Sequence, residues 1–313
     1  MTIEAVLLVG FGGPDGPEDI RPFLDNVLRG RPVPPARYEE VVHHYLEIGG
    51  RSPYNDFTFQ QAQGLRKLLK REGPEMPVYV GMRNWKPFLA DTLLEMHQAG
   101  IQEALGIILA PQQGEASWGR YQTAVRQASE EVRLHVGQPG PSILYSDPWY
   151  DHPLFVEAQA DKLKCKSSKI PFDRRPLARL LFVAHSVPMS LAHPYVEQLR
   201  ASCAAVVEEA GFSDWELVYQ SRSGNPRDPW LEPDLCDALV RLAAEGVRDA
   251  IVVPISFVSD HVEVLFDLDR EAAQLAAEKG MGYYRVCTVQ DHPSFIRMLA
   301  DLVRRASPGS VSS

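Results

Sequence analysis

Residues 180–220 read LLFVAHSVPMSLAHPYVEQLRASCAAVVEEAGFSDWELVYQ. The apolar run LLFVA comes first, an amphipathic stretch over 195–210 follows, and a second run, ELVYQ, ends the segment. The first run is apolar on both faces, as is typical of a strand in a parallel sheet that helices cover on both sides. The segment therefore predicts one strand–helix–strand unit.

The same alternation continues along the whole chain. The predicted strands are the apolar runs at 6–9, 78–82, 105–109, 142–145, 180–184, 216–220, 250–253 and 282–286. Between them lie the amphipathic stretches 60–70, 86–99, 195–210 and 233–245. The runs form two sets of four, which predicts an α/β protein with two similar Rossmann-like domains, each a four-stranded parallel sheet flanked by helices.

We place the two domains at residues 1–150 and 151–290, with a helix over about 291–306 as a candidate to pack back onto the first domain. The basic stretch KLKCKSSKIPFDRRPL, residues 162–177, lacks apolar periodicity and is interpreted as a loop near the domain junction. A cleft between two such domains is the expected active site. Residues at the carboxyl ends of strands are therefore the candidates for function.

Composition excludes several classes of function. The chain has 313 residues, of which 45% are hydrophobic and 23% charged, with a net charge of −9 and a pI of about 5.5. This acidity argues against nucleic-acid binding and against a polybasic membrane surface. No apolar stretch is long enough to span a bilayer. The N-terminal MTIEAVLLVGFGGP lacks a basic region before its apolar run, so it is expected to be a first strand in a cytoplasmic protein.

The four cysteines, Cys165, Cys203, Cys236 and Cys287, are far apart and form no CxxC pair. This spacing weakens a zinc or iron–sulfur interpretation and predicts reduced thiols.

A glycine-rich turn, Gly10 to Pro14, follows the first predicted strand. A dinucleotide fingerprint needs a glycine where the chain has Asp15, and Pro14 prevents a helix from starting close behind the glycines. Two explanations stay open: the glycines let backbone approach a flat or bulky ligand, or they make a tight turn.

Chemistry-bearing residues follow the strands of the second set. His185 ends the 180–184 run, where a neutral imidazole can accept a proton or bind a metal. A polar loop over 220–226 leads into Trp230. Its composition is typical of a solvated loop whose tryptophan packs on the core.

The segment FVSDHVEVLFDLDRE, residues 257–271, carries the strongest signal. With Ser259 or Asp260 as helix N-cap, Glu263, Asp267 and Glu271 fall at i, i+4 and i+8 on one helix face. The row is either an acidic solvated face or a ladder of oxygen ligands for a divalent cation. His185 and Glu263 are predicted to face one cleft and to serve proton transfer or metal handling.

These segments resemble the ferrochelatase family, whose members insert ferrous iron into a porphyrin. The resemblance rests on VGFGGP (9–14), RGRPVP (29–34), HYLEIGGRSP (44–53), AHSVP (184–188), YQSRSGNPRDPWLEPD (219–234) and FVSDHVEVLFDLD (257–269). They are most similar to the bacterial, actinobacterial-type branch, which implies coproporphyrin III as substrate. Protoporphyrin IX is the alternative substrate; a non-catalytic tetrapyrrole or solute binder and a cobalt chelatase are more distant alternatives.

The resemblance also implies roles for individual residues. His185 and Glu263 would be catalytic, and together with Asp267 and Glu271 would handle the metal. Porphyrin contacts would come from Phe11, Gly12, Gly13, Pro14, Arg29, Arg31, Ser52, Tyr121 and Trp230.

Two departures from the family pattern bear on chemistry. Phe11 stands where many relatives have a tyrosine, so an axial oxygen contact is absent. The C-terminal tail SPGSVSS and the segment 117–121 have no cysteine, so no [2Fe–2S] cluster and no cofactor beyond the substrate Fe²⁺ are expected. The implied partners are porphyrin and iron, and the implied state is a monomer or a weak dimer.

Overall fold

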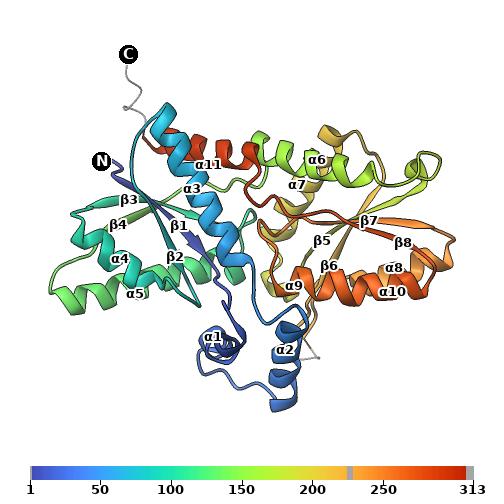
Figure 1. Ribbon diagram of the computed structural model, residues 1–313, viewed down its shortest axis with the longest axis horizontal. Coiled ribbons are helices and arrows are strands. Elements are labelled where there is room, and N and C mark those ends of the chain that lie inside the picture. Colours follow the sequence, from blue (N-terminus) through green and yellow to red (C-terminus); the bar gives the residue numbers. More distant parts are fainter. Residues whose placement is uncertain (1, 224–227, 308–313) are drawn as a thin grey trace. The chain divides into compact units, whose positions relative to one another are not determined.

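The computed structural model describes residues 2–223 and 228–307 (Figure 1). The chain divides into two compact units, Met1–Leu109 with Ser117–Pro148 and Asp291–Ser313, and Ala110–Ala116 with Trp149–Gln290. Each unit is built on one sheet. No helix in the described ranges is both long and apolar enough to cross a membrane.

The first unit contains a four-stranded parallel sheet in the order β2-β1-β3-β4. Its strands are β1 (Ala5–Gly10), β2 (Val78–Met82), β3 (Glu103–Ile108) and β4 (Ser142–Tyr145). Its helices are α1 (Ile20–Leu28), α2 (Pro35–Glu47), α3 (Tyr54–Glu72), α4 (Leu89–Gln98), α5 (Arg120–Val136) and α11 (Pro293–Ala306), with the short turn η1 (Pro17–Asp19). The central strand β1 is buried along its whole length.

The second unit repeats this arrangement with a parallel sheet in the order β6-β5-β7-β8. Its strands are β5 (Arg179–His185), β6 (Trp215–Gln220), β7 (Asp249–Pro254) and β8 (Gly282–Arg285). Its helices are α6 (Pro153–Ser167), α7 (Tyr195–Ala210), α8 (Leu235–Ala244), α9 (Val262–Leu265) and α10 (Ala273–Glu278). The remaining elements are the 3₁₀ turns η3 (Arg175–Leu177) and η4 (Met189–Leu191) and the π-helices η2 (Glu115–Gly119) and η5 (Asp267–Ala272).

Alternate side chains of β5 pack on opposite faces of the second sheet. Leu180, Phe182 and Ala184 join a buried cluster with α6 and α7. Leu181 and Val183 join a second cluster with α8 and with the segment from α9 to α10. A strand covered on both sides needs apolar residues at every position, which is why these runs were visible in the sequence. The predicted fold class, two four-stranded parallel sheets flanked by helices, is confirmed.

The strand order predicts where a functional site lies in each unit. The chain moves from the first strand of a sheet to one side and then returns to the other side, so its direction reverses between β1 and β3 and between β5 and β7. At such a switch point the two neighbouring connections leave on opposite faces of the sheet and open a crevice at the carboxyl ends of the strands. The residues after β5 and β7 are therefore the first to inspect in the second unit.

The helix after the last strand of each sheet in chain order, β4 or β8, belongs to the opposite unit from that strand. Helix α6 follows β4 but packs on α7 and β8 in the second unit, and α11 follows β8 but packs on α3 in the first. Both helices begin with the same Asp-His-Pro sequence. In each, the Nδ1 atom of the N-cap histidine, His152 or His292, accepts a hydrogen bond from the backbone N–H two residues later.

The interpretation of residues 162–177 as a junction loop was wrong. Helix α6 continues to Ser167, and the chain passes between the units at Pro148, before this helix. Only Leu163 and Ser167 are buried in this last part of α6, and the intervening lysines hide the helical period.

The N-cap of α11 provides a test of this local structure. We expect His292→Ala to lower the free energy of unfolding by about 1 kcal/mol, because a helix donor loses its acceptor. His292→Asn restores a side-chain oxygen and should recover most of that loss in urea denaturation. An asparagine variant as unstable as the alanine variant would contradict the capping role.

Candidate active site

His185 is the last residue of β5, at the switch point of the second sheet. Its backbone is held from two sides, since its N–H donates to Ser256 Oγ at 3.4 Å and its carbonyl accepts from the Tyr195 hydroxyl at 3.2 Å. In the side chain, Nδ1 donates to the carbonyl of Ser186. This bond fixes the neutral tautomer, so Nε2 carries the free lone pair.

Glu263 lies in the first turn of α9, and His261 rather than Ser259 or Asp260 is the N-cap of that helix. The Nδ1 atom of His261 accepts from the backbone N–H of Glu263 at 3.2 Å, and its ring packs edge-on against Phe257 at 4.4 Å between centroids. Burial lowers the pKa of His261, which keeps this acceptor nitrogen unprotonated. The predicted cap was wrong because the Asp260 carboxylate is bound elsewhere.

His185 and Glu263 form the predicted pair. Nε2 of His185 lies 3.6 Å from Oε1 of Glu263, which is an ion-pair distance, and the two side chains are 31% and 34% exposed. Burial alone would lower the pKa of His185, but the charge of Glu263 outweighs it and the pKa is raised. Burial alone would raise the pKa of Glu263, but His185 and then His261 lower it to about 2. At neutral pH the glutamate is an anion beside an imidazole that binds protons readily.

The regular helix expected after Glu263 was also wrong. Residues Asp267–Ala272 form a π-helix, in which the N–H of Glu271 donates to the carbonyl of Phe266, five residues earlier, at 3.0 Å. Such wide turns are frequent at functional sites. The turn shifts Glu271 out of a regular α-helical row, and its side chain is exposed.

Asp267 differs from Glu263 in its protonation. Its carboxylate accepts a hydrogen bond from the Ser221 hydroxyl. Burial, followed by the nearby charge of Glu263, raises the pKa of Asp267 to about 7. The charge of Glu271 adds to this effect.

Arg285, at the end of β8, anchors both ends of this segment. Its guanidinium binds Asp269 through Nε at 2.8 Å and Asp260 through a second nitrogen at 3.2 Å. The buried Asp260 carboxylate also accepts from Thr288 at 2.9 Å and Gln290 at 3.3 Å. The loop before His261 and the π-helix after Glu263 are therefore fixed to one cation.

In the first unit, the predicted turn from Phe11 to Pro14 is held by backbone bonds. The N–H of Phe11 donates to the Tyr54 hydroxyl at 2.9 Å, and the N–H of Ser52 donates to the carbonyl of Pro14 at 2.9 Å. A Cβ atom on Gly13 would lie 2.6 Å from Cβ of Ser52, and Gly12, at φ +88°, would meet Trp85 at 3.0 Å. Packing of the protein itself therefore requires both glycines, and this requirement leaves the turn available to contact a ligand.

Four arginines gather near this turn. The charges of Arg29, Arg31 and Arg120 act on Arg83, whose pKa is lowered mainly by its own burial. Arg29 also donates to the carbonyl of Arg83 at 2.8 Å. Nε of Arg83 is buried without a hydrogen-bond partner in the part of the chain that the structure describes. This cluster, which we call the arginine cluster, is suited to an anionic ligand.

The two remaining predicted contacts are aromatic. Tyr121 is buried and hydrogen-bonds to Tyr54, whose pKa burial raises to about 12. Trp230 bridges to Pro188 in the loop after β5, and its indole N–H is buried without a partner among the described residues. Residues 224–227 of the polar loop before Trp230 lie outside the described residues.

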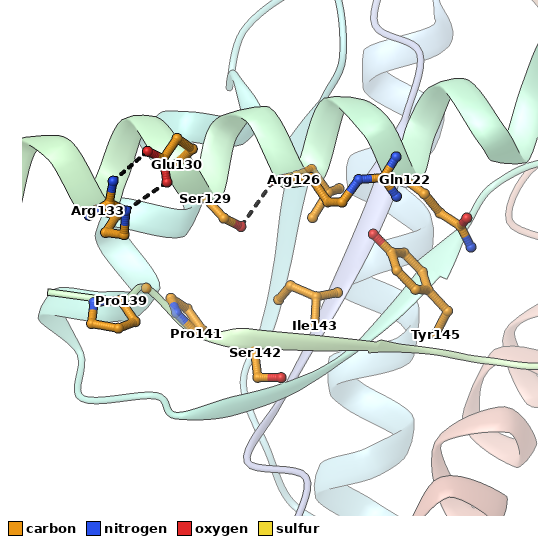
Figure 2. A pocket seen from close by; sticks show the side chains of 12 residues that line it. Gln122, Arg126, Ser129, Glu130, Arg133, Pro139, Pro141, Ser142, Ile143 and Tyr145 are labelled. Atoms are coloured by element: carbon orange, nitrogen blue, oxygen red, sulfur yellow. Dashed lines mark hydrogen bonds and ion pairs between the residues drawn. The ribbon is translucent and has the colours of Figure 1, made fainter.

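No group of three or more His, Cys, Asp or Glu side chains in the described ranges is arranged to hold a metal ion. A cavity of about 540 Å³ lies elsewhere, between α5 and β4 in the first unit (Figure 2). Its lining, which includes Arg126, Arg133 and Tyr145, holds none of the predicted site residues.

Several residues of this site were not predictable from the sequence. Arg83 and Arg120 are isolated in the sequence and join Arg29 only through the fold. His261 lies in the segment 257–271, but histidine is not a usual N-cap, so nothing in the sequence indicated its capping role. Arg285 lies at the end of a predicted strand, and a charged residue at that position was the one sign in the sequence that it has a function.

The pKa of Asp267 makes a prediction about stability. A folded-state pKa of about 7, against 3.8 for an ordinary aspartate, means that the folded protein holds a proton that the unfolded chain has released. Stability is therefore lost as the pH rises from about 4 to about 7. With EDTA present, Asp267→Asn should stabilise the protein at about pH 8 by on the order of 2 kcal/mol and have little effect at about pH 4.

Asp269→Asn is the matched control for this measurement, because it makes the same change in the same π-helix. That variant weakens the contact with Arg285, so it should destabilise the protein at both pH values. An Asp267→Asn variant with no gain in stability at high pH would contradict the raised pKa.

The anchoring role of Arg285 is testable in the same way. Arg285→Met should lower the free energy of unfolding by about 3 kcal/mol, because the buried Asp260 loses its cation. Arg241 offers a matched control, since it also bridges two carboxylates, those of Glu216 and Glu245, but at the surface. Arg241→Met should cost less than about 1 kcal/mol, and equal losses in urea denaturation would contradict the assignment.

Comparison with known proteins identifies the family of this chain. The family model described as Ferrochelatase matches residues 3–307. Coproporphyrin III ferrochelatase of Nocardia farcinica is 43% identical over 322 residues, covering 99% of this chain and 90% of the relative. The protein of that name in Mycolicibacterium vanbaalenii is 41% identical, covering 97% and 90%. The ferrochelatase of Rhodopirellula baltica is 41% identical, covering 96% and 85%.

Among solved structures, SirB from Bacillus subtilis with Fe³⁺ has the same fold, with a TM-score of 0.60 at 13% identity over 99% of this chain and 97% of that one. DR2241 from Deinococcus radiodurans, a multi-domain protein with structural similarity to chelatases, gives a TM-score of 0.55 at 16% identity over 100% of this chain and 56% of that one. The family match over nearly the whole chain, together with relatives above 40% identity, confirms the predicted resemblance: this chain belongs to the ferrochelatase family.

Proposed function

We propose that this chain inserts Fe²⁺ into coproporphyrin III to form coprohaem in haem biosynthesis, acting as a metal chelatase. The observation that carries the proposal is the His185–Glu263 pair at the switch point of the second sheet. The choice of coproporphyrin III over protoporphyrin IX is supported by the relatives that carry this name and by the arginine cluster.

Metal insertion requires two pyrrole N–H protons to leave the porphyrin. In our proposal, Nε2 of His185 accepts one of them, because the bond from Nδ1 to Ser186 leaves its lone pair free. The imidazolium that forms lies beside the Glu263 carboxylate, which is ionised at neutral pH and stabilises the new charge.

The pKa values of the carboxylates would decide which of them attracts iron and which transfers a proton. Glu263 is too weak a base to hold a proton near neutrality and is suited to attract the substrate Fe²⁺. Asp267, with a pKa of about 7, is suited to accept and release a proton. Asp267 and the exposed Glu271 would replace water molecules on the incoming iron.

We propose that the first unit binds the porphyrin carboxylates. Coproporphyrin III has four carboxylates and protoporphyrin IX has two. Arg29, Arg31, Ser52 and Tyr121 are the contacts implied by the family, and the cluster adds Arg83 and Arg120. Charge-assisted hydrogen bonds from guanidinium groups favour the more highly charged substrate. The turn Phe11, Gly12, Gly13 and Pro14, together with Trp230, would provide the contacts to the ring.

We further propose that the chain acts in the cytoplasm, as a monomer, without an iron–sulfur cluster. All four cysteines are free thiols, as is usual in a reducing compartment. Burial raises the pKa of Cys203 and Cys236, in the latter to about 12, so these thiols resist the deprotonation that cluster ligation needs.

The test is turnover under anaerobic conditions with Fe²⁺ and each porphyrin in the same detergent. We expect kcat/KM for coproporphyrin III to exceed that for protoporphyrin IX by at least about tenfold, as additional charge-assisted bonds would give. His185→Ala and Glu263→Gln should each lower kcat by about 100-fold or more, while porphyrin binding measured by fluorescence changes little.

The surface pair His193 and Glu197, 3.3 Å apart, provides matched controls. His193→Ala and Glu197→Gln should leave turnover unchanged. Equal or better use of protoporphyrin IX would overturn the substrate, and near wild-type rates in the His185 and Glu263 variants would overturn the site. Porphyrin binding without turnover would show a binding protein rather than an enzyme.

A further inference from the structure

The connection between α6 and β5 carries two apolar side chains that the fold leaves in solvent. Phe172 is 86% exposed and Leu177 is 78% exposed, and both lie within six residues of one another. The connection is yellow-green in Figure 1. Neither side chain has a role in the proposed reaction. We call residues 168–178 the apolar loop.

The apolar loop is fixed rather than loosely extended. Arg174 binds the buried carboxylate of Asp249, with one of its two hydrogen bonds at 2.8 Å. Arg175 donates to the carbonyls of Ser168 and Ile170, both at 3.2 Å, and Ile170 is buried in the core. The two arginines therefore hold the backbone to the second unit, while Phe172 and Leu177 stay at the surface.

The loop and the end of α6 are basic in an otherwise acidic protein. Residues 162–177 contain six lysines and arginines and a single carboxylate, Asp173, whereas the whole chain has a net charge of −9. Arg174 is paired, and Lys164 lies 3.7 Å from Glu209. Lys166 and Lys169 have no carboxylate partner within the described part of the chain.

We propose that the apolar loop docks this protein onto an anionic lipid surface, with Phe172 and Leu177 entering the interface and Lys166 and Lys169 at the headgroups. Two protruding side chains are too few for a stable protein interface, which needs about 800 Å² on each partner. They suit a bilayer, where apolar insertion and basic residues together give weak, reversible binding. Salt screens charges beyond about 8–10 Å, so carboxylates farther than that from the loop do not prevent this contact.

The test is sedimentation of the full chain with vesicles of phosphatidylcholine, either pure or with about 30% phosphatidylglycerol. Wild type should bind the anionic vesicles in about 0.05 M salt, bind pure phosphatidylcholine much less, and dissociate in about 0.5 M salt. The double variants Phe172→Ser/Leu177→Ser and Lys166→Glu/Lys169→Glu should each weaken binding by about tenfold or more. Both should retain wild-type turnover on a porphyrin in detergent.

Matched controls come from exposed residues of the first unit. Leu134→Ser, at a side chain that is 70% exposed, and Lys67→Glu/Lys70→Glu on α3 should leave vesicle binding unchanged. In Phe172→Trp, brominated lipid should quench the added fluorescence. Equal binding by wild type and the loop variants, or no preference for anionic vesicles, would overturn the proposal. Dimers in sedimentation velocity that only the Phe172 and Leu177 changes dissociate would identify a second copy as the occupant instead.

Discussion

The buried carboxylate of Asp260 is the constraint on which the second unit's site depends. A carboxylate that is almost removed from water must be paired, and here Arg285, Thr288 and Gln290 satisfy it. Because the same guanidinium holds Asp269, the loop before α9 and the π-helix after it keep one spacing. Glu263 lies between these two anchors, so its distance to His185 is set by residues that never touch the reacting groups.

Three titratable groups of this site differ in protonation because their surroundings differ. Glu263 is held as an anion by His185 and His261, whereas burial and that same anion push Asp267 toward its protonated form. His185 gains affinity for a proton from Glu263. Separation of pKa values between neighbouring groups is how one site assigns an acid, a base and a fixed charge near neutral pH. Removal of the charge on any one of these groups would therefore change the pKa values of the other two.

The sequence predicted the parts of the structure that depend on local pattern. All eight strands were visible as short apolar runs, and the central strands β1, β5 and β7, which are almost wholly buried, gave the clearest ones. Helix 195–210 was predicted with its observed bounds. Phe11 and His185 were predicted at strand ends and Glu263 at a helix start, so locating these elements also located the three residues. The π-helix and the His261 cap were not predictable because nothing in the local pattern marks a wide turn or a histidine cap. The arginine cluster was not predictable because its members are distant in sequence. Asp260 looked like a cap only because its ligand, Arg285, follows 25 positions later.

The order of elements in the chain also limits how the two units form. Helix α6 follows the last strand of the first sheet but completes the second unit, and α11 follows the last strand of the second sheet but completes the first. Residues 110–116 also belong to the second unit, where Oε1 of Gln113 accepts a hydrogen bond from Nε2 of Gln198 at 3.2 Å. A chain cut near residue 150 would therefore leave the first unit without α11 and the second without this segment. The cover that α3 and α11 together give the first sheet is complete only after this last helix has been made.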